Sequence, residues 1–136
     1  MERRHYQSGT PWEPRFGYAR AVRIGPHVWV AGTTATDERG RVVGEGDAYA
    51  QAVRAFANVR RALRALGADA VDVVRTRLYV VDAARDAEAV GRAHAEAFGA
   101  VRPVATMVEV RALVDPAMLV EIEAEAYVTG PGQVGS

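Results

Sequence analysis

The 136-residue chain contains no cysteine and no lysine. Without cysteine it has no thiol nucleophile, no disulfide and no thiolate metal site. Without lysine it forms no Schiff base through a lysine, and it lacks the lysine of a phosphate-binding loop. These two absences exclude several large classes of enzyme before any motif is considered.

The chain also lacks a net charge and a long apolar run. Its 17 basic residues, all of them arginine, balance 17 acidic residues. A neutral chain has no overall field that draws nucleic acid or an anionic membrane towards it. No apolar run approaches the roughly 18 residues of a membrane span, and no basic-then-apolar leader precedes the fold. We therefore expect a cytoplasmic protein with no membrane partner and no nucleic-acid partner.

What is present is an ordinary globular composition, with 49% hydrophobic and 25% charged residues. This length and balance predict one domain with its own core. Glycine and proline punctuate residues 1–17, which predicts an irregular N-terminal arm. Trp12 and Phe16 favour partial burial of that arm against the body. Residues 18–128 form the predicted domain, and residues 129–136 a flexible tail.

Hydrophobic periodicity places the main elements. Alternating residues predict strands at Tyr18–Ile24, His27–Ala31, Val71–Val81, Arg102–Val110 and Val120–Ala126. Apolar residues spaced by three and four predict helices from Asp47, a good N-cap, to about Leu66, and from about Asp86 to Phe98.

The resulting order, β-β-α-β-α-β-β, predicts an α+β fold in which one mixed sheet carries both helices on a single face. A turn signal at Asp115–Pro116 favours a hairpin between the last two strands. The opposite face of the sheet would be uncovered in a monomer, so oligomerisation is expected. Three regularly spaced glutamates in Val120–Ala126 indicate a face that meets solvent, a partner subunit or a ligand.

The last two predicted strands resemble the C-terminal signature of the YjgF/Rid (reactive intermediate deaminase) family, Pro-Ala-Arg-Ser-x-Val-Glu-Val followed by Val-Glu-Ile-Glu-Ala. The block Gly17-Tyr-Ala-Arg-Ala-Val22 is similar to the family's Gly-Pro-Tyr-Ser-Gln-Ala-Val. Further similar blocks occur in the same order, at residues 28–32, 72–82 and 95–99. The resemblance implies a Rid/chorismate-mutase-like fold and a homotrimer with small-molecule clefts between subunits. It implies no metal and no organic cofactor.

The resemblance also implies a site. In the deaminating members, backbone groups near a glycine orient a 2-imino acid, and a glutamate-linked water attacks the imine. Glu121 falls at the position of that glutamate, where it would serve as general base or, alternatively, as a buried interface carboxylate. Gly32 and Thr33 would hold the polar end of the substrate through their backbone groups. Tyr18 and Met107 would form walls, although Tyr18 is somewhat more favoured as a packing residue.

One position departs from the family pattern. The deaminating members bind the substrate carboxylate with an arginine, and this chain has Ala105 there. Alanine offers nothing in place of a guanidinium–carboxylate bond, so ordinary 2-imino acids are not the expected substrates. Arg77, Arg111 and Arg15 are candidates to replace the missing group. For Arg77 and Arg111, pairing with glutamates of neighbouring strands is the favoured interpretation.

Three functions remain open at this point. The first is hydrolysis of a C=N bond in a substrate other than an ordinary 2-imino acid, and the second is non-catalytic ligand binding or regulation by a trimer. The third is RNA cleavage or inhibition of translation, which has been attributed to some relatives. Four arginines on the outer face of the first helix are compatible with RNA binding, but a solvated helix face is the favoured interpretation of Arg54, Arg60, Arg61 and Arg64.

Overall fold

The structure is a computed structural model, and it describes residues 1–130. The predicted tail, residues 129–136, lies almost wholly outside these described residues. In chain order, the elements are β1 (Arg3–Tyr6), α1 (Trp12–Phe16), β2 (Ala21–Ile24), β3 (His27–Thr33), α2 (Ala48–Ala65), the short 3-10 helix η1 (Ala70–Asp72), β4 (Val73–Val80), α3 (Ala83–Phe98), β5 (Val104–Glu109) and β6 (Val120–Tyr127).

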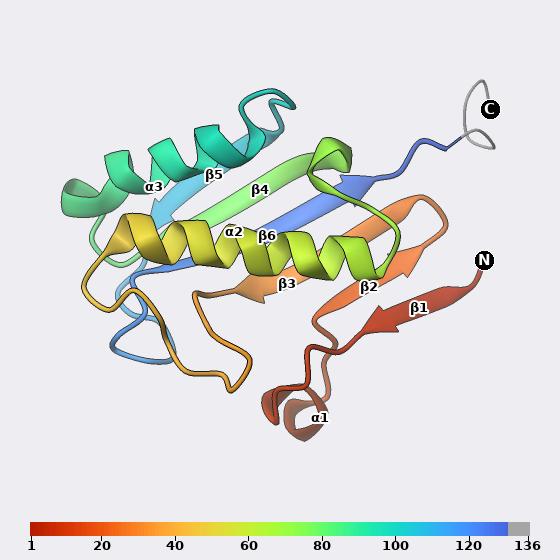
Figure 1. The fold of residues 1–136 in the computed structure, drawn as a ribbon, viewed down its shortest axis with the longest axis horizontal. Coiled ribbons are helices and arrows are strands. Elements are labelled where there is room, and N and C mark those ends of the chain that lie inside the picture. The colour runs from red at the N-terminus through yellow and green to blue at the C-terminus, as the bar shows by residue number, and fades with distance from the viewer. Residues whose placement is uncertain (131–136) are drawn as a thin grey trace.

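Six strands form one mixed sheet in the order β1-β2-β3-β6-β4-β5. The pair β4–β5 is parallel and the other pairs are antiparallel. The two long helices α2 and α3 run side by side across the same face of this sheet (Figure 1). This arrangement confirms the predicted α+β class. We call the face opposite α2 and α3 the open face.

The predicted hairpin of the last two strands is wrong. β6 lies between β3 and β4, and β5 occupies the edge beyond β4. The turn at Asp115 does form, with the Met118 amide 2.9 Å from the Asp115 carbonyl oxygen. It leads the chain past β4 instead of folding it back on β5. The helix α3 crosses over the sheet between β4 and β5, so β5 returns in the same direction as β4 and pairs in parallel.

The core lies between the helices and one face of the sheet. Burial alternates strictly along β6, where Val120, Ile122, Ala124 and Ala126 are buried beneath α2. Asp47 caps α2 as predicted, because its carboxylate accepts from the Ala50 amide at 3.0 Å. α3 starts three residues earlier than predicted. The Asp82 side chain accepts from the Arg85 amide at 3.1 Å, and this cap extends the helix to Ala83.

The N-terminal arm, residues 1–17, is not irregular as predicted. β1 joins the edge of the sheet by pairing with β2, and α1 forms one short turn. Neither was evident locally, because β1 has no alternating apolar face and α1 is too short to show a period. Glu13, 1% exposed, ties the arm to the body. Trp12 and Phe16 stack on each other instead and stay 48% and 64% exposed.

Candidate functional site

The site begins with an irregularity in β3. The register between β3 and β6 shifts between Val30 and Thr33, so three steps along β3 match two along β6. Such a bulge turns side chains and backbone groups away from the regular alternation of the strand. Thr33 pairs with Ile122 on the buried side, and Gly32 faces Glu121. A Cβ at position 32 would overlap Oε2 of Glu121, so the close approach of backbone and carboxylate requires glycine.

Glu121 projects from β6 on the side away from the core. Burial raises the pKa of its carboxyl above the ordinary value, the Arg20 charge opposes this rise, and the Glu123 charge adds to it. Within the described chain, the Glu121 carboxylate makes no direct hydrogen bond and no ion pair. It is therefore a half-buried carboxyl group, close to a glycine backbone, whose lone pairs are free to accept a proton.

A cleft of about 510 Å³ opens beside Glu121. Its walls come from the N-terminal arm, the segment just before β2, the end of β3 and the loop after it, α2, the loop before β6 and the start of β6. Four predicted site residues meet at this cleft: Tyr18, Gly32, Thr33 and Glu121. Tyr18 is partly exposed, whereas Thr33 is buried and donates its hydroxyl to the Ala31 carbonyl oxygen at 2.7 Å. A smaller groove of about 310 Å³ on the other side of Glu121 is lined by Tyr79 and Glu123.

Two further predicted site residues, Ala105 and Met107, lie elsewhere. Both are on the edge strand β5, which β4 separates from β6. Their register partners are Thr76 and Leu78, so they face the helix side of the sheet. Met107 packs against the core, while Ala105 is exposed. A single chain therefore does not bring the position of the missing arginine to the cleft.

None of the three predicted replacement arginines lies in the cleft. Arg77 pairs across the strands with Glu125 at 3.0 Å, as the pairing interpretation held, although with a different glutamate from those considered. Arg111 is exposed in the loop after β5. Arg15 lies over the stacked rings of Trp12 and Phe16, with its guanidinium carbon 5.6 Å and 5.1 Å from the two ring centroids.

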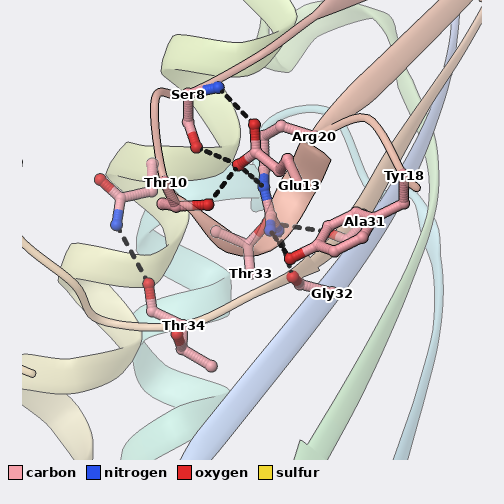
Figure 2. Close-up of polar contacts among 10 residues, drawn as sticks. Ser8, Thr10, Glu13, Tyr18, Arg20, Ala31, Gly32, Thr33 and Thr34 are labelled. Carbon is pink, nitrogen blue, oxygen red and sulfur yellow. Dashed lines mark hydrogen bonds and ion pairs between the residues drawn. The ribbon is translucent and has the colours of Figure 1, made fainter. Parts of the chain in front are cut away.

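The residue that sequence reasoning missed is Arg20. Its guanidinium lies between the Glu13 carboxylate and the Gly32 carbonyl oxygen, beside the ring of Tyr18 (Figure 2). Arg20 Nε is 3.5 Å from Glu13 Oε2, Nη1 donates to the Gly32 carbonyl oxygen, and Nη2 is 3.3 Å from the Tyr18 hydroxyl. The sequence did contain one indication of Arg20, which is a departure from the family pattern: Arg20 stands where that pattern has glutamine. Nothing local tied it to Gly32 or to the arm.

Most charges around the cleft are already paired. Asp37 pairs with Arg41 at 3.2 Å and Glu38 with Arg54 at 3.6 Å. Among the described cleft residues, Arg61 is the cation without a carboxylate partner, and its Nη1 lies 3.3 Å from Asn58 Oδ1. The cleft thus presents one uncompensated positive charge on α2, in addition to the protonatable Glu121.

Two classes of site receive no support in residues 1–130. Within that range, no group of three or more histidine, aspartate or glutamate side chains is arranged to hold a metal ion. No helix there has the length and apolar character to cross a membrane. His94, the most buried of the histidines, contacts the Thr76 hydroxyl at 2.8 Å, and burial lowers its pKa.

The chain is similar in sequence to known proteins along most of its length. The family model described as Endoribonuclease L-PSP matches residues 10–128. An uncharacterized protein of Streptomyces coelicolor is 47% identical over 124 residues, covering 91% of each chain. A 3-aminoacrylate deaminase, RutC, of Acinetobacter baylyi is 34% identical over 120 residues, covering 88% of this chain and 93% of that protein.

Solved structures agree with the sequence relatives. A crystal structure from Mycobacterium tuberculosis, described as a member of the YjgF/YER057c/UK114 family, superimposes with a TM-score of 0.85 at 50% identity. The match covers 93% of this chain and all of that one. A RidA structure from the Antarctic bacterium Psychrobacter has a TM-score of 0.75 and 26% identity, covering 82% of this chain and 89% of that chain. The chain therefore belongs to the Endoribonuclease L-PSP family, the YjgF/Rid group of proteins.

Proposed function

We propose that this protein hydrolyses the C=N bond of a small imine, or of the imine tautomer of an enamine, with Glu121 as the general base. The proposal rests on the environment of the Glu121 carboxyl group. This group is half-buried at the cleft wall and has no hydrogen-bond partner within residues 1–130, and burial raises its pKa. A base poised in this way accepts a proton from water more readily than an exposed glutamate does.

The reaction needs water and no other reactant. Glu121 takes a proton from a water molecule as the water oxygen bonds to the imine carbon, and the C=N bond becomes a C–N bond. The proton passes to the nitrogen. The carbinolamine then collapses: its hydroxyl proton is transferred to the nitrogen, the C=O bond forms, the C–N bond breaks and ammonia or an amine leaves. The relative named as a 3-aminoacrylate deaminase supports this class of reaction.

The substrate is one that does not need the arginine replaced by Ala105. Arg20 is neutralised by Glu13 and is not a free anchor for an anion. Within residues 1–130, the uncompensated cation that lines the cleft is Arg61, on α2. A substrate whose anionic or strongly polar group lies away from the C=N bond suits this arrangement better than a 2-imino acid, in which the carboxylate is attached to the imine carbon.

The working form is a homotrimer with the clefts completed at subunit boundaries. In the single chain, the open face leaves Trp29 42% and Tyr127 40% exposed, and the edge strand β5 leaves Val104 59% exposed. Large apolar side chains left exposed on the open face and at the sheet edge favour burial against further copies. Sedimentation equilibrium should give three times the chain mass, and a monomeric mass would contradict this part of the proposal.

The test is ammonia release from imines generated in situ, with 2-imino acids and uncharged imines compared in parallel. Wild type should hydrolyse an imine without an adjacent carboxylate faster than it hydrolyses a 2-imino acid. Glu121→Gln keeps the shape of the side chain and removes the base, so the rate should fall by about 100-fold or more. Glu123→Gln, on the same strand, is the matched control and should retain more activity.

Two results would overturn the proposal. Equal rates for wild type and Glu121→Gln would show that Glu121 is not the base. If no imine in the panel is hydrolysed, the non-catalytic ligand-binding trimer becomes the better description. RNA cleavage is not proposed, because the arginines of α2 are largely paired: Arg60 and Arg64 share Asp69 at 2.6 Å and 2.9 Å. A continuous row of free cations is what RNA binding requires.

A further inference from the structure

The arrangement around Arg20 connects three parts of the chain that are distant in sequence. Arg20 follows the arm and precedes β2, Glu13 is in α1, and Gly32 is in the β3 bulge. Figure 2 shows the guanidinium of Arg20 placed between the other two. The question is whether this buried pair only stabilises the arm or also controls the site.

The Glu13 carboxylate accepts several hydrogen bonds from residues of the N-terminal arm. It accepts from the Ser8 amide at 2.8 Å, from the Thr10 hydroxyl at 2.9 Å and from the Ser8 hydroxyl. Burial raises the pKa of Glu13, but the hydrogen bonds from Ser8 and Thr10 and the charge of Arg20 outweigh it, so the net pKa is lowered. Glu13 is therefore charged at neutral pH and gives Arg20 a fixed partner.

The Arg20 end holds the backbone of the bulge. Nη1 donates to the Gly32 carbonyl oxygen and lies 3.4 Å from the Thr33 hydroxyl. The Ala31 amide donates to the Arg20 carbonyl oxygen at 2.9 Å, so the backbone of Arg20 also holds the bulge. The residue fixed in this way, Gly32, is the one whose Cα lies against the Glu121 carboxylate.

We propose that Glu13 and Arg20 form a positioning pair, which uses the N-terminal arm to hold the Gly32 carbonyl and the Arg20 charge in one arrangement around Glu121. This inference rests on the proposed function in so far as Glu121 is the base. Arg20 touches the backbone beside Glu121 and acts through it, so neither member of the pair is a catalytic residue. The N-terminal arm is thereby part of the site and not an appendage to it.

The charges that face Glu121 make the inference testable. Arg20 approaches from the start of β2, Glu123 follows on β6, and Tyr79 of β4 is its register partner. Arg20 is the cation of this set. Arg20→Gln should therefore shift the Glu121 titration upwards, by about one pH unit. Glu13→Gln removes the negative charge that neutralises Arg20, so it should shift the same titration downwards by a smaller amount.

The experiment follows the side-chain carboxyl carbon of Glu121 by NMR in ¹³C-glutamate-labelled protein, with Glu121→Gln used to assign the signal. Because this readout needs no turnover, its failure is distinguishable from a failure of the proposed function. Arg23→Gln is the matched control. Arg23 lies three residues further on, in β2, and its guanidinium donates to the Leu66 and Gly25 carbonyl oxygens and not to the bulge.

Opposite shifts for Arg20→Gln and Glu13→Gln, with no shift for Arg23→Gln, are the expected result. A purely structural pair would loosen the fold without moving the Glu121 titration in opposite directions. Amide hydrogen exchange supplies a second readout: Arg20→Gln should accelerate exchange at Ala31–Thr33 and in Ser8–Phe16. The proposal is overturned if Arg20→Gln leaves the Glu121 titration at its wild-type value, even where exchange at Ala31–Thr33 accelerates. A shift no larger than that of Arg23→Gln would overturn it equally.

Discussion

The cleft and the edge strand β5 each hold part of the site that the sequence predicts. They differ in whether a single chain brings the predicted residues of that part together. At the cleft, Tyr18 from the segment before β2, Gly32 from β3 and Glu121 from β6 come together within one chain. On β5, Ala105 and Met107 face the helix side of the sheet, beyond β4. Glu121 and its backbone surroundings are thus a local property of the fold.

The position of the missing arginine is of a different kind. Ala105 is exposed at the sheet edge, and a side chain placed there reaches a cleft only if the cleft belongs to another copy of the chain. The departure from the family pattern at Ala105 would then alter substrate anchoring and leave the surroundings of Glu121 intact. Experiments that change one region and leave the other intact test whether the cleft and β5 contribute separately.

The largest expected effect in the cleft comes from Gly32→Ala. The added methyl group would overlap the Glu121 carboxylate, and the flexible end of that side chain would move instead of the backbone. We expect imine hydrolysis to fall about 100-fold from the misplaced base, with little change in thermal stability. Activity and melting temperature should be measured together. An unaffected rate would mean that the contact between Gly32 and Glu121 has no part in catalysis.

The edge strand is tested by Ala105→Arg. In a trimer that brings β5 of one copy to the cleft of another, the new guanidinium should raise the kcat/KM for 2-imino acids by about tenfold. The Glu121→Gln change should abolish this gain in the double variant. The same rates for Ala105→Arg and wild type would show that β5 does not approach a cleft, and the comparison between the two regions would need another explanation.

A smaller effect is expected from Arg61, which lines the cleft and has no carboxylate partner in the described part of the chain. Arg61→Ala should raise KM several-fold, about tenfold at most, and leave kcat close to its wild-type value if this side chain only binds the substrate. Arg60→Ala is a closely matched control, since Arg60 is the adjacent residue and pairs with Asp69 outside the cleft. Equal KM values for the two variants would remove Arg61 from the site.

The smallest effect concerns the pH dependence of folding stability. Burial raises the pKa of Glu121 in the folded state above its ordinary value of 4.5, so the folded protein binds the proton more tightly than the unfolded chain. Stability therefore falls as pH rises from the ordinary pKa through the raised one. Glu121→Gln should lose this decline and be the more stable protein at neutral pH. Urea denaturation across that range measures the difference, and parallel curves would contradict it.

The fold could be predicted largely because burial imposes a period. Along β6, every second residue from Val120 to Ala126 is buried, and this is the pattern that the sequence displays. The choice of partner strand has no such local signature. The segment Arg102–Val110 alternates equally well beside β6 or beside β4, and only the crossover through α3 determines that β5 pairs with β4.

The site residues also fall into those that could be predicted from the sequence and those that could not. Glu121 and Gly32 could be located from the family signature, because that signature marks strand positions that the fold keeps. Arg20 could not, since its role depends on Glu13, in a five-residue helix that shows no periodicity. The bulge at Gly32 was equally hidden: a single extra residue in β3 leaves the alternation on either side intact.

The central place of β6 has a consequence for how the protein is made. β3 and β4 are not neighbours, and the sheet is continuous only because β6 lies between them. A ribosome releases β6 after every other strand, so during synthesis the β1–β3 half and the β4–β5 half have no strand to join them. The nascent chain therefore exposes the inner edges of both halves until the last strand emerges. Chaperone dependence and aggregation during translation should accordingly be governed by the delay before residues 120–127 are available.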